Sequence, residues 1–272
     1  MNKSRERAME ILSIHLRKIQ ASMEDAVQSV VLVGSLTNGS YTADNGSDID
    51  LIHILRDDAA PESRGKLLAL IGETEAMTQR DIPISRCVYR YSHLFFPYPT
   101  DFSLCLENKD YIELPIEIMR MKDSGLTVWG EDILDAISYP RREDVLFFKM
   151  LSGKWAQLEA ERGFRPIPDD QLPVRLIVQS VLVRAMLDYF LVTGASCSNK
   201  AAVAERLRRD VPEYALQELT EWCTRWRYSK EWDTAEVETH ITELWPDWSR
   251  LRQGQGVEYV PMRNKEEQHG HS

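Results

Sequence analysis

Two aspartates separated by one residue, Asp48 and Asp50, are the residues of this sequence best suited to chemistry. They lie in a run, 47–52, that is typical of a strand and in which apolar residues follow and separate the two acids. Side chains alternate along a strand, so both carboxylates face one side, about 7 Å apart. Such a pair repels unless a cation lies between the two groups. Because Mg²⁺ is commonly held by carboxylates together with substrate phosphates, the pair predicts a magnesium site, with two ions expected.

A second motif precedes the aspartates and is suited to phosphate. The apolar run Val30–Val33 predicts a buried strand, and Gly34 and Ser35 follow it as a tight turn that opens a helix. Backbone N–H groups and a hydroxyl at such a turn can hold a phosphate. We therefore expect Gly34, Ser35 and Ser47 to contact a nucleoside triphosphate, close to the predicted metal ions.

The whole pattern resembles the nucleotidyltransferase superfamily: an apolar strand, Gly34-Ser35, Gly39, and then Ser47-Asp48-Ile49-Asp50. The alternative is a plain strand–turn–helix unit with an acidic, solvated strand. The resemblance implies an enzyme with ATP as co-substrate. It also implies an α/β (α+β) nucleotidyltransferase fold with a small mixed sheet, here followed by an all-helical C-terminal domain.

The superfamily needs a third carboxylate, either as a metal ligand or as the base for the acceptor hydroxyl. The sequence offers Glu107, Glu113 and Glu117. Glu107 ends a predicted strand at 102–106 and is favoured, because a neighbouring strand would bring it beside Asp50. We expect Glu107 to act in catalysis and to complete the metal site, with Glu117 as the next choice.

A narrower resemblance is to the streptomycin/spectinomycin (aminoglycoside 3''/9-) adenylyltransferases. It rests on the segments 98–107, 114–130 and 176–214, in which Glu107 follows Tyr98-Pro99 and Lys200 follows Thr193-Gly194. The resemblance implies that Glu107 is the base and that Lys200 reaches the ATP phosphates. The Trp-containing region after about residue 227 shows no correspondence.

The acceptor is expected to be a small cationic molecule such as an aminoglycoside or aminocyclitol antibiotic. A net charge of −10 disfavours nucleic acid and suits a cation. Asp188, Tyr189 and Trp129 are candidate acceptor contacts, with core packing as the alternative for each. Another acceptor (a lincosamide, a protein or RNA), an antitoxin-like binding module and an ATP sensor remain the alternatives.

The composition is that of a globular protein: 272 residues, 43% hydrophobic and 28% charged. The four cysteines and six histidines show no metal-ligand spacing. With no apolar run of about eighteen residues and no signal peptide pattern, we expect a cytoplasmic protein without a membrane span. The oligomeric state is left open, and a monomer is compatible with the sequence. The predicted division is a catalytic domain at 1–163, a helical substrate-binding domain at 164–263 and a disordered tail at 264–272.

Overall fold

The computed structural model describes residues 5–41, 48–79, 81–95, 110–146 and 174–227, together with residue 239. In chain order the elements are α1 (Arg5–Ser22), β1 (Val27–Leu32), α2 (Ser35–Asn38), β2 (Leu51–Leu55), α3 (Ser63–Met77), β3 (Cys87–Arg90), a 3₁₀ turn (Tyr91–Leu94), α5 (Asp110–Ser124), β4 (Leu126–Gly130), α7 (Val174–Thr193), α8 (Val203–Asp210) and α9 (Gln217–Arg227). Among these described residues, none of the helices is both long and apolar enough to cross a membrane.

The four strands form one mixed sheet in the order β3-β2-β1-β4. β1 is antiparallel to both β2 and β4, while β2 is parallel to β3. The register pairs Leu32 with Leu51, and Val33 donates a backbone hydrogen bond to the carbonyl of Asp50 at 3.0 Å. The end of β1 and the start of β2 are therefore side by side, which brings the Gly34 turn next to Asp50.

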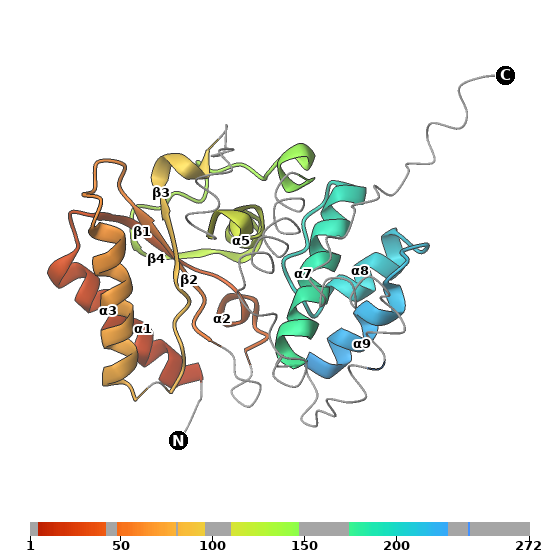
Figure 1. The fold of residues 1–272 in the computed structure, drawn as a ribbon, viewed down its shortest axis with the longest axis horizontal. Helices are drawn as coiled ribbons and strands as arrows, with labels where there is room; N and C mark the ends of the chain where they lie inside the picture. Colours follow the sequence, from red (N-terminus) through yellow and green to blue (C-terminus); the bar gives the residue numbers. More distant parts are fainter. Residues whose placement is uncertain are drawn as a thin grey trace, which may run out of the picture.

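Helices cover both faces of the sheet (Figure 1). Alternate residues of β1 and β2 point to opposite faces. Val30 and Leu51 pack with α1 and α3, whereas Val31 and Ile52 pack with α5 on the other face. These two cores fix the sheet against its helices, and the predicted α/β fold with a small mixed sheet is confirmed.

The helical part, α7 to α9, has its own core and lies beside the sheet domain (Figure 1). Helix α5 packs against both parts: Leu114 and Ile118 lie in the core beneath the sheet, whereas Ile116 packs against the helical core. Met119 joins a third cluster with Phe190 of α7. Side chains of α5 can therefore contact both the sheet domain and the helical part.

Two buried histidines join α1 to the sheet. His15 Nε2 lies 2.9 Å from His53 Nε2, and the outer nitrogens lie 3.3 Å from Thr74 Oγ1 and from the carbonyl of Cys87. With one proton on each ring, His53 Nδ1–H donates to the Cys87 carbonyl and His15 Nε2–H donates to His53 Nε2. A second proton on His53 would place two N–H groups face to face. His53 therefore has a structural role.

Helix α5 begins at Asp110 and contains Pro115. A proline costs a helix one backbone hydrogen bond, which α5 tolerates because it is packed between two cores. The apolar segment before Gly130 forms β4, an edge strand paired with β1. The predicted strand 102–106, the predicted domain boundary at 163 and the predicted tail at 264–272 fall outside the described residues.

Candidate functional site

Gly34 lies directly against Asp50 at the end of the sheet. Its backbone has a φ of 78° and a ψ of −146°, a conformation that favours glycine. A Cβ at this position would clash with Asp50 Oδ2 and would lie 2.8 Å from a guanidinium nitrogen of Arg120. Only glycine thus leaves room for the Asp50 carboxylate, which explains the Gly-Ser turn of the sequence motif.

The two aspartates lie just before β2, and the alternation predicted for them is present. Asp48 is exposed and Asp50 half-buried, whereas Ile49 and Leu51 between and after them are buried. Partial loss of hydration and the negative charge of Asp50 raise the pKa of the Asp48 carboxyl. The positive charges of Arg120 and Lys200 act to lower it. The two carboxylates are therefore close enough to repel each other.

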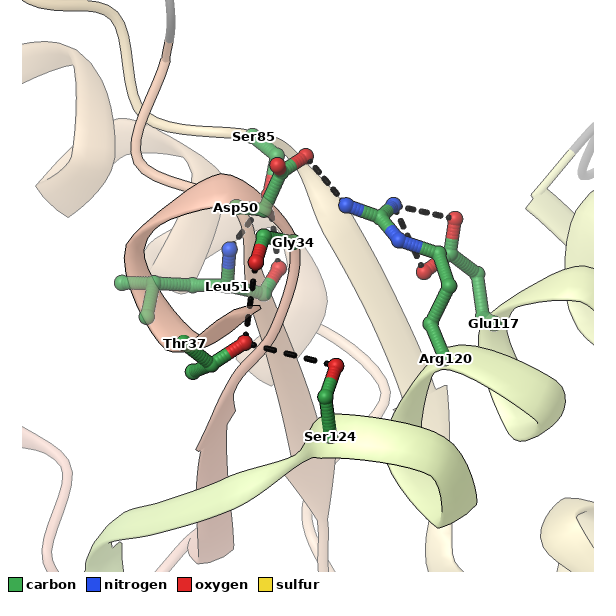
Figure 2. A network of polar contacts seen from close by, with 8 residues as sticks. All are labelled: Gly34, Thr37, Asp50, Leu51, Ser85, Glu117, Arg120 and Ser124. Carbon is green, nitrogen blue, oxygen red and sulfur yellow. Dashed lines mark hydrogen bonds and ion pairs between the residues drawn. The ribbon is translucent and has the colours of Figure 1, made fainter. Parts of the chain in front are cut away.

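Arg120 of α5 bridges Asp50 to a second carboxylate (Figure 2). Its guanidinium lies 2.7 Å from Asp50 Oδ1 and donates to both oxygens of Glu117, at 2.9 and 3.1 Å. The side chain of Glu117 is only 5% exposed. Burial disfavours the charge of Arg120, but Glu117 and Asp50 outweigh it and raise the pKa of the guanidinium above its ordinary value. Arg120 consequently remains a fixed cation beside Asp50.

Lys200 approaches the same aspartates from the helical part. It lies in the loop between α7 and α8. Burial, with the charges of Arg120 and Arg227, lowers the pKa of its ammonium group to about 8, while Asp50 and Asp48 act to raise it. The charge of Lys200 thus acts on both aspartates beside the Gly34 turn, although it lies 166 residues after Gly34. The roles expected for these residues stay predictions.

Hydrogen bonds hold the backbone around the aspartates. Ser85 Oγ lies 2.7 Å from both the N–H and the carbonyl of Leu51, and so fixes the residue after Asp50. On the other side, Thr37 Oγ1 lies 2.9 Å from the Gly34 carbonyl and 3.4 Å from Ser124 Oγ of α5 (Figure 2). The Gly34 turn is therefore tied to both β2 and α5.

The donor set fits a magnesium ion. Two mutually repelling carboxylates supply hard oxygen ligands, and Gly34 makes room for one of them, the carboxylate of Asp50. Within the part of the chain that the structure describes, no third His, Cys, Asp or Glu completes a metal cluster with them. The predicted third ligand, Glu107, lies outside the described residues, as does Ser47.

The other predicted residues are placed as follows. Glu113 lies within α5, and Glu117 is engaged with Arg120, which favours a role in holding that arginine over proton abstraction. Trp129 of β4 packs against the core on the α1 and α3 side.

Two further candidates lie in the helical part. Asp188 accepts a hydrogen bond from Tyr214 at 2.9 Å, and Tyr189 donates one to Asp210 at 2.7 Å. Both residues are buried among the helices of that part. A contact of Asp188, Tyr189 or Trp129 with an acceptor stays a prediction.

The sequence reasoning missed Arg120 and Arg227. An arginine on an amphipathic helix is ordinarily solvated, so its type alone gives no signal. The neighbouring residues do give a signal for Arg120. It follows Glu117 by three residues, the spacing of an ion pair on one helix face, and it stands between Met119 and Met121 in an apolar stretch.

Comparisons with known proteins agree with this geometry. Residues 14–113 match the model of a family described as "Nucleotidyltransferase domain". The match includes Gly34, Asp48 and Asp50. This part of the chain is thus similar to a domain of enzymes that transfer a nucleotide, and the predicted resemblance to the nucleotidyltransferase superfamily is confirmed. A search of curated proteins gave no significant match.

The solved structures that match this chain are distant. They include the spectinomycin adenyltransferase AAD(9) from Enterococcus faecialis with ATP and spectinomycin, at 16% identity and a TM-score of 0.47, over 91% of this chain and 97% of that chain. A toxin–antitoxin MntA-HpeT mutant matches at 15% identity and a TM-score of 0.27, over 56% of this chain and 91% of that chain. A toxin–antitoxin structure with AMP-PNP matches at 16% identity and a TM-score of 0.25, over 58% of this chain and 92% of that chain.

Proposed function

We propose that the protein transfers AMP from ATP to a hydroxyl of a small cationic acceptor and releases pyrophosphate, in a Mg²⁺-dependent reaction. One observation carries the proposal: Asp48 and Asp50 lie at a turn where Gly34 makes room for the Asp50 carboxylate, and the charge of Lys200 acts on both acids. Carboxylates for a metal and a cation for phosphates are the two groups that a nucleoside triphosphate requires.

Different residues would bind the metal ion and the triphosphate in the proposed reaction. Asp48 and Asp50 would hold Mg²⁺, with Glu107 as the third ligand, and the ion would neutralise charge on the leaving pyrophosphate. Lys200, with the turn of Gly34 and Ser35 and with Ser47, would hold the triphosphate.

Glu107 would take the proton of the acceptor hydroxyl. The hydroxyl oxygen then forms a bond to the α-phosphorus. The bond from that phosphorus to the bridging oxygen breaks, and pyrophosphate leaves with the electron pair. Holding the reactants in line supplies much of the acceleration.

The acceptor class rests on the sequence. The resemblance of the segments around Glu107 and Lys200 to the streptomycin/spectinomycin adenylyltransferases nominates an aminoglycoside or aminocyclitol. The net charge of −10 is compatible with a cationic acceptor and disfavours RNA or DNA. Streptomycin and spectinomycin are therefore the first acceptors to test.

The test is pyrophosphate release from Mg-ATP with the full chain and a panel led by these two compounds. The Asp50→Asn variant removes one metal ligand, and Asp58→Asn, an exposed aspartate in the turn after β2, is the matched control. Release that requires an aminocyclitol and Asp50, and that Asp58→Asn leaves unchanged, supports the proposal. Release with a lincosamide, protein or RNA instead would refute the acceptor class. ATP binding without any release would refute the proposed reaction in favour of a sensor or binding module.

A further inference from the structure

The loop that brings Lys200 to the aspartates is held by a carboxylate of the other part of the molecule. Residues 194–199 connect α7 to the turn before α8 and form neither helix nor strand. Cys197 of this loop is buried in the helical core, and the residues around it are held by polar contacts. The position of Lys200 therefore depends on the contacts that the loop makes.

Asp123 supplies those contacts from the last turn of α5. Its Oδ2 accepts hydrogen bonds from Ser196 Oγ at 2.9 Å and from the backbone N–H of Ser198 at 2.8 Å. Its Oδ1 accepts a third, from the Tyr139 hydroxyl at 2.9 Å. One carboxylate thus joins α5, the segment after β4 and the loop of the helical part.

The place of Asp123 on its helix supports a role outside the helix. A negative charge in the last turn opposes the helix dipole and disfavours the helix. Asp123 is also exposed, so it adds nothing to the cores on either side of α5. Its three hydrogen bonds to other segments are what the carboxylate contributes to the structure.

Other contacts of the loop act within the helical part. Arg206 of α8 donates to the Ser196 carbonyl at 2.9 Å, and Thr193 Oγ1 accepts from the Ala195 N–H at 3.1 Å. They shape the loop but do not tie it to the sheet domain. A separate bond from Arg142 to the Leu191 carbonyl joins the two parts at the end of α7. It lies several residues before Lys200.

Helix α5 therefore orders both charged partners of the aspartates. Arg120 contacts Asp50 directly, and Asp123, three residues further along, holds the loop that carries Lys200. We propose that Asp123 is a positioning residue that sets Lys200 in the nucleotide site. This inference rests on the proposed function, in which Lys200 holds the phosphates of ATP.

The experiment measures the dissociation constant of the non-cleavable analogue α,β-methylene ATP, with Mg²⁺, by isothermal titration calorimetry. The proteins are the wild type, Asp123→Ala, Lys200→Ala and the double variant. Asp135→Ala, an exposed aspartate in the turn after β4, is the matched control for the loss of one surface charge. Thermal melting of each variant checks that the fold is retained.

We expect Asp123→Ala to weaken binding at least about tenfold, the size of one lost charge-assisted hydrogen bond. The double variant should bind no more weakly than Lys200→Ala alone, because both changes remove the same contact. Asp135→Ala should bind as the wild type does. A purely structural role for Asp123 would instead lower affinity equally whether or not Lys200 is present.

Two results would overturn the inference alone: wild-type affinity in Asp123→Ala while Lys200→Ala is weakened, or effects of the two substitutions that multiply. If the wild type does not bind the analogue, or if Lys200→Ala binds it as tightly as the wild type does, the proposed nucleotide site itself is refuted. The failure of the inference and that of the proposed function are thus distinguishable.

Discussion

Replacing Arg120 by methionine tests the buried charge network of the site. The substitution keeps an unbranched side chain of similar reach but removes the cation that contacts Asp50 and Glu117. Asp50 keeps some access to water, with 18% of its side chain exposed, whereas Glu117 has 5%. Most of the cost should therefore come from Glu117, which loses the buried cation that balances its charge.

Protonation of Glu117 limits the cost of removing Arg120. Instead of remaining charged, the carboxyl can take up a proton, and this limits the penalty at pH 7 to about 1.4 kcal/mol for each pH unit above its ordinary pKa of about 4.3. The free energy of unfolding should fall by about 3 to 4 kcal/mol at pH 7. At pH 5.5 the loss relative to wild type should shrink to about 1.6 kcal/mol.

Urea unfolding followed by tryptophan fluorescence measures these losses at both pH values. The double variant Arg120→Met with Glu117→Leu should recover much of the stability, because it also removes the buried carboxylate that Arg120 balances. Arg208→Met is the control, since Arg208 is 67% exposed and its bond to Glu221 should contribute at most about 1 kcal/mol. A loss below about 1 kcal/mol at pH 7, or a double variant no more stable than the single one, would refute the reasoning.

Two further predictions concern the glycine turn and the histidine pair. Gly34→Ala should abolish nucleotide transfer in the pyrophosphate assay, because its Cβ would clash with Asp50. The control Gly72→Ala in α3, where a Cβ meets nothing within 4 Å, should keep full activity. An active Gly34→Ala variant would contradict the geometry. Burial lowers the pKa of His15 to about 3 and of His53 to about 4, with the charge of the neighbouring ring adding to the effect at His15. The unfolded chain therefore binds more protons below pH 6.5, and stability should fall as the pH falls, by about 2 kcal/mol per histidine between pH 7.5 and pH 5. Urea unfolding of the wild type at the two pH values measures this loss, and equal stability at both would show that the pair is not held neutral.

The part of the site that could be predicted from the sequence is the part that local geometry determines. Gly34 and the two aspartates lie within one strand–turn–strand unit, so their alternation and spacing already fix which side chains meet. Lys200 is far away in the sequence, and only the resemblance to a known family nominated it. The structure places it beside the aspartates, where its charge acts on theirs.

Arg120 could not be predicted in the same way, because its role depends on the packing of α5 between two cores. The sequence did not indicate that this arginine would point to the end of the sheet. The strand β4 was missed for a related reason: its residues are only partly buried at the edge of the sheet, so their apolar pattern is weak. Pairing with β1, a contact of high sequence separation, is what makes this segment a strand.

The most direct test of the proposed nucleotide transfer follows the phosphorus itself. The full chain is incubated with Mg²⁺, streptomycin or spectinomycin, and ATP labelled with ³²P at either the α- or the γ-phosphate, and the acceptor is then isolated. The account predicts that the acceptor gains label from α-labelled ATP only, and that Asp48→Asn and Asp50→Asn each abolish the gain. Label transferred from the γ-phosphate, or transfer that persists without both aspartates, would contradict it.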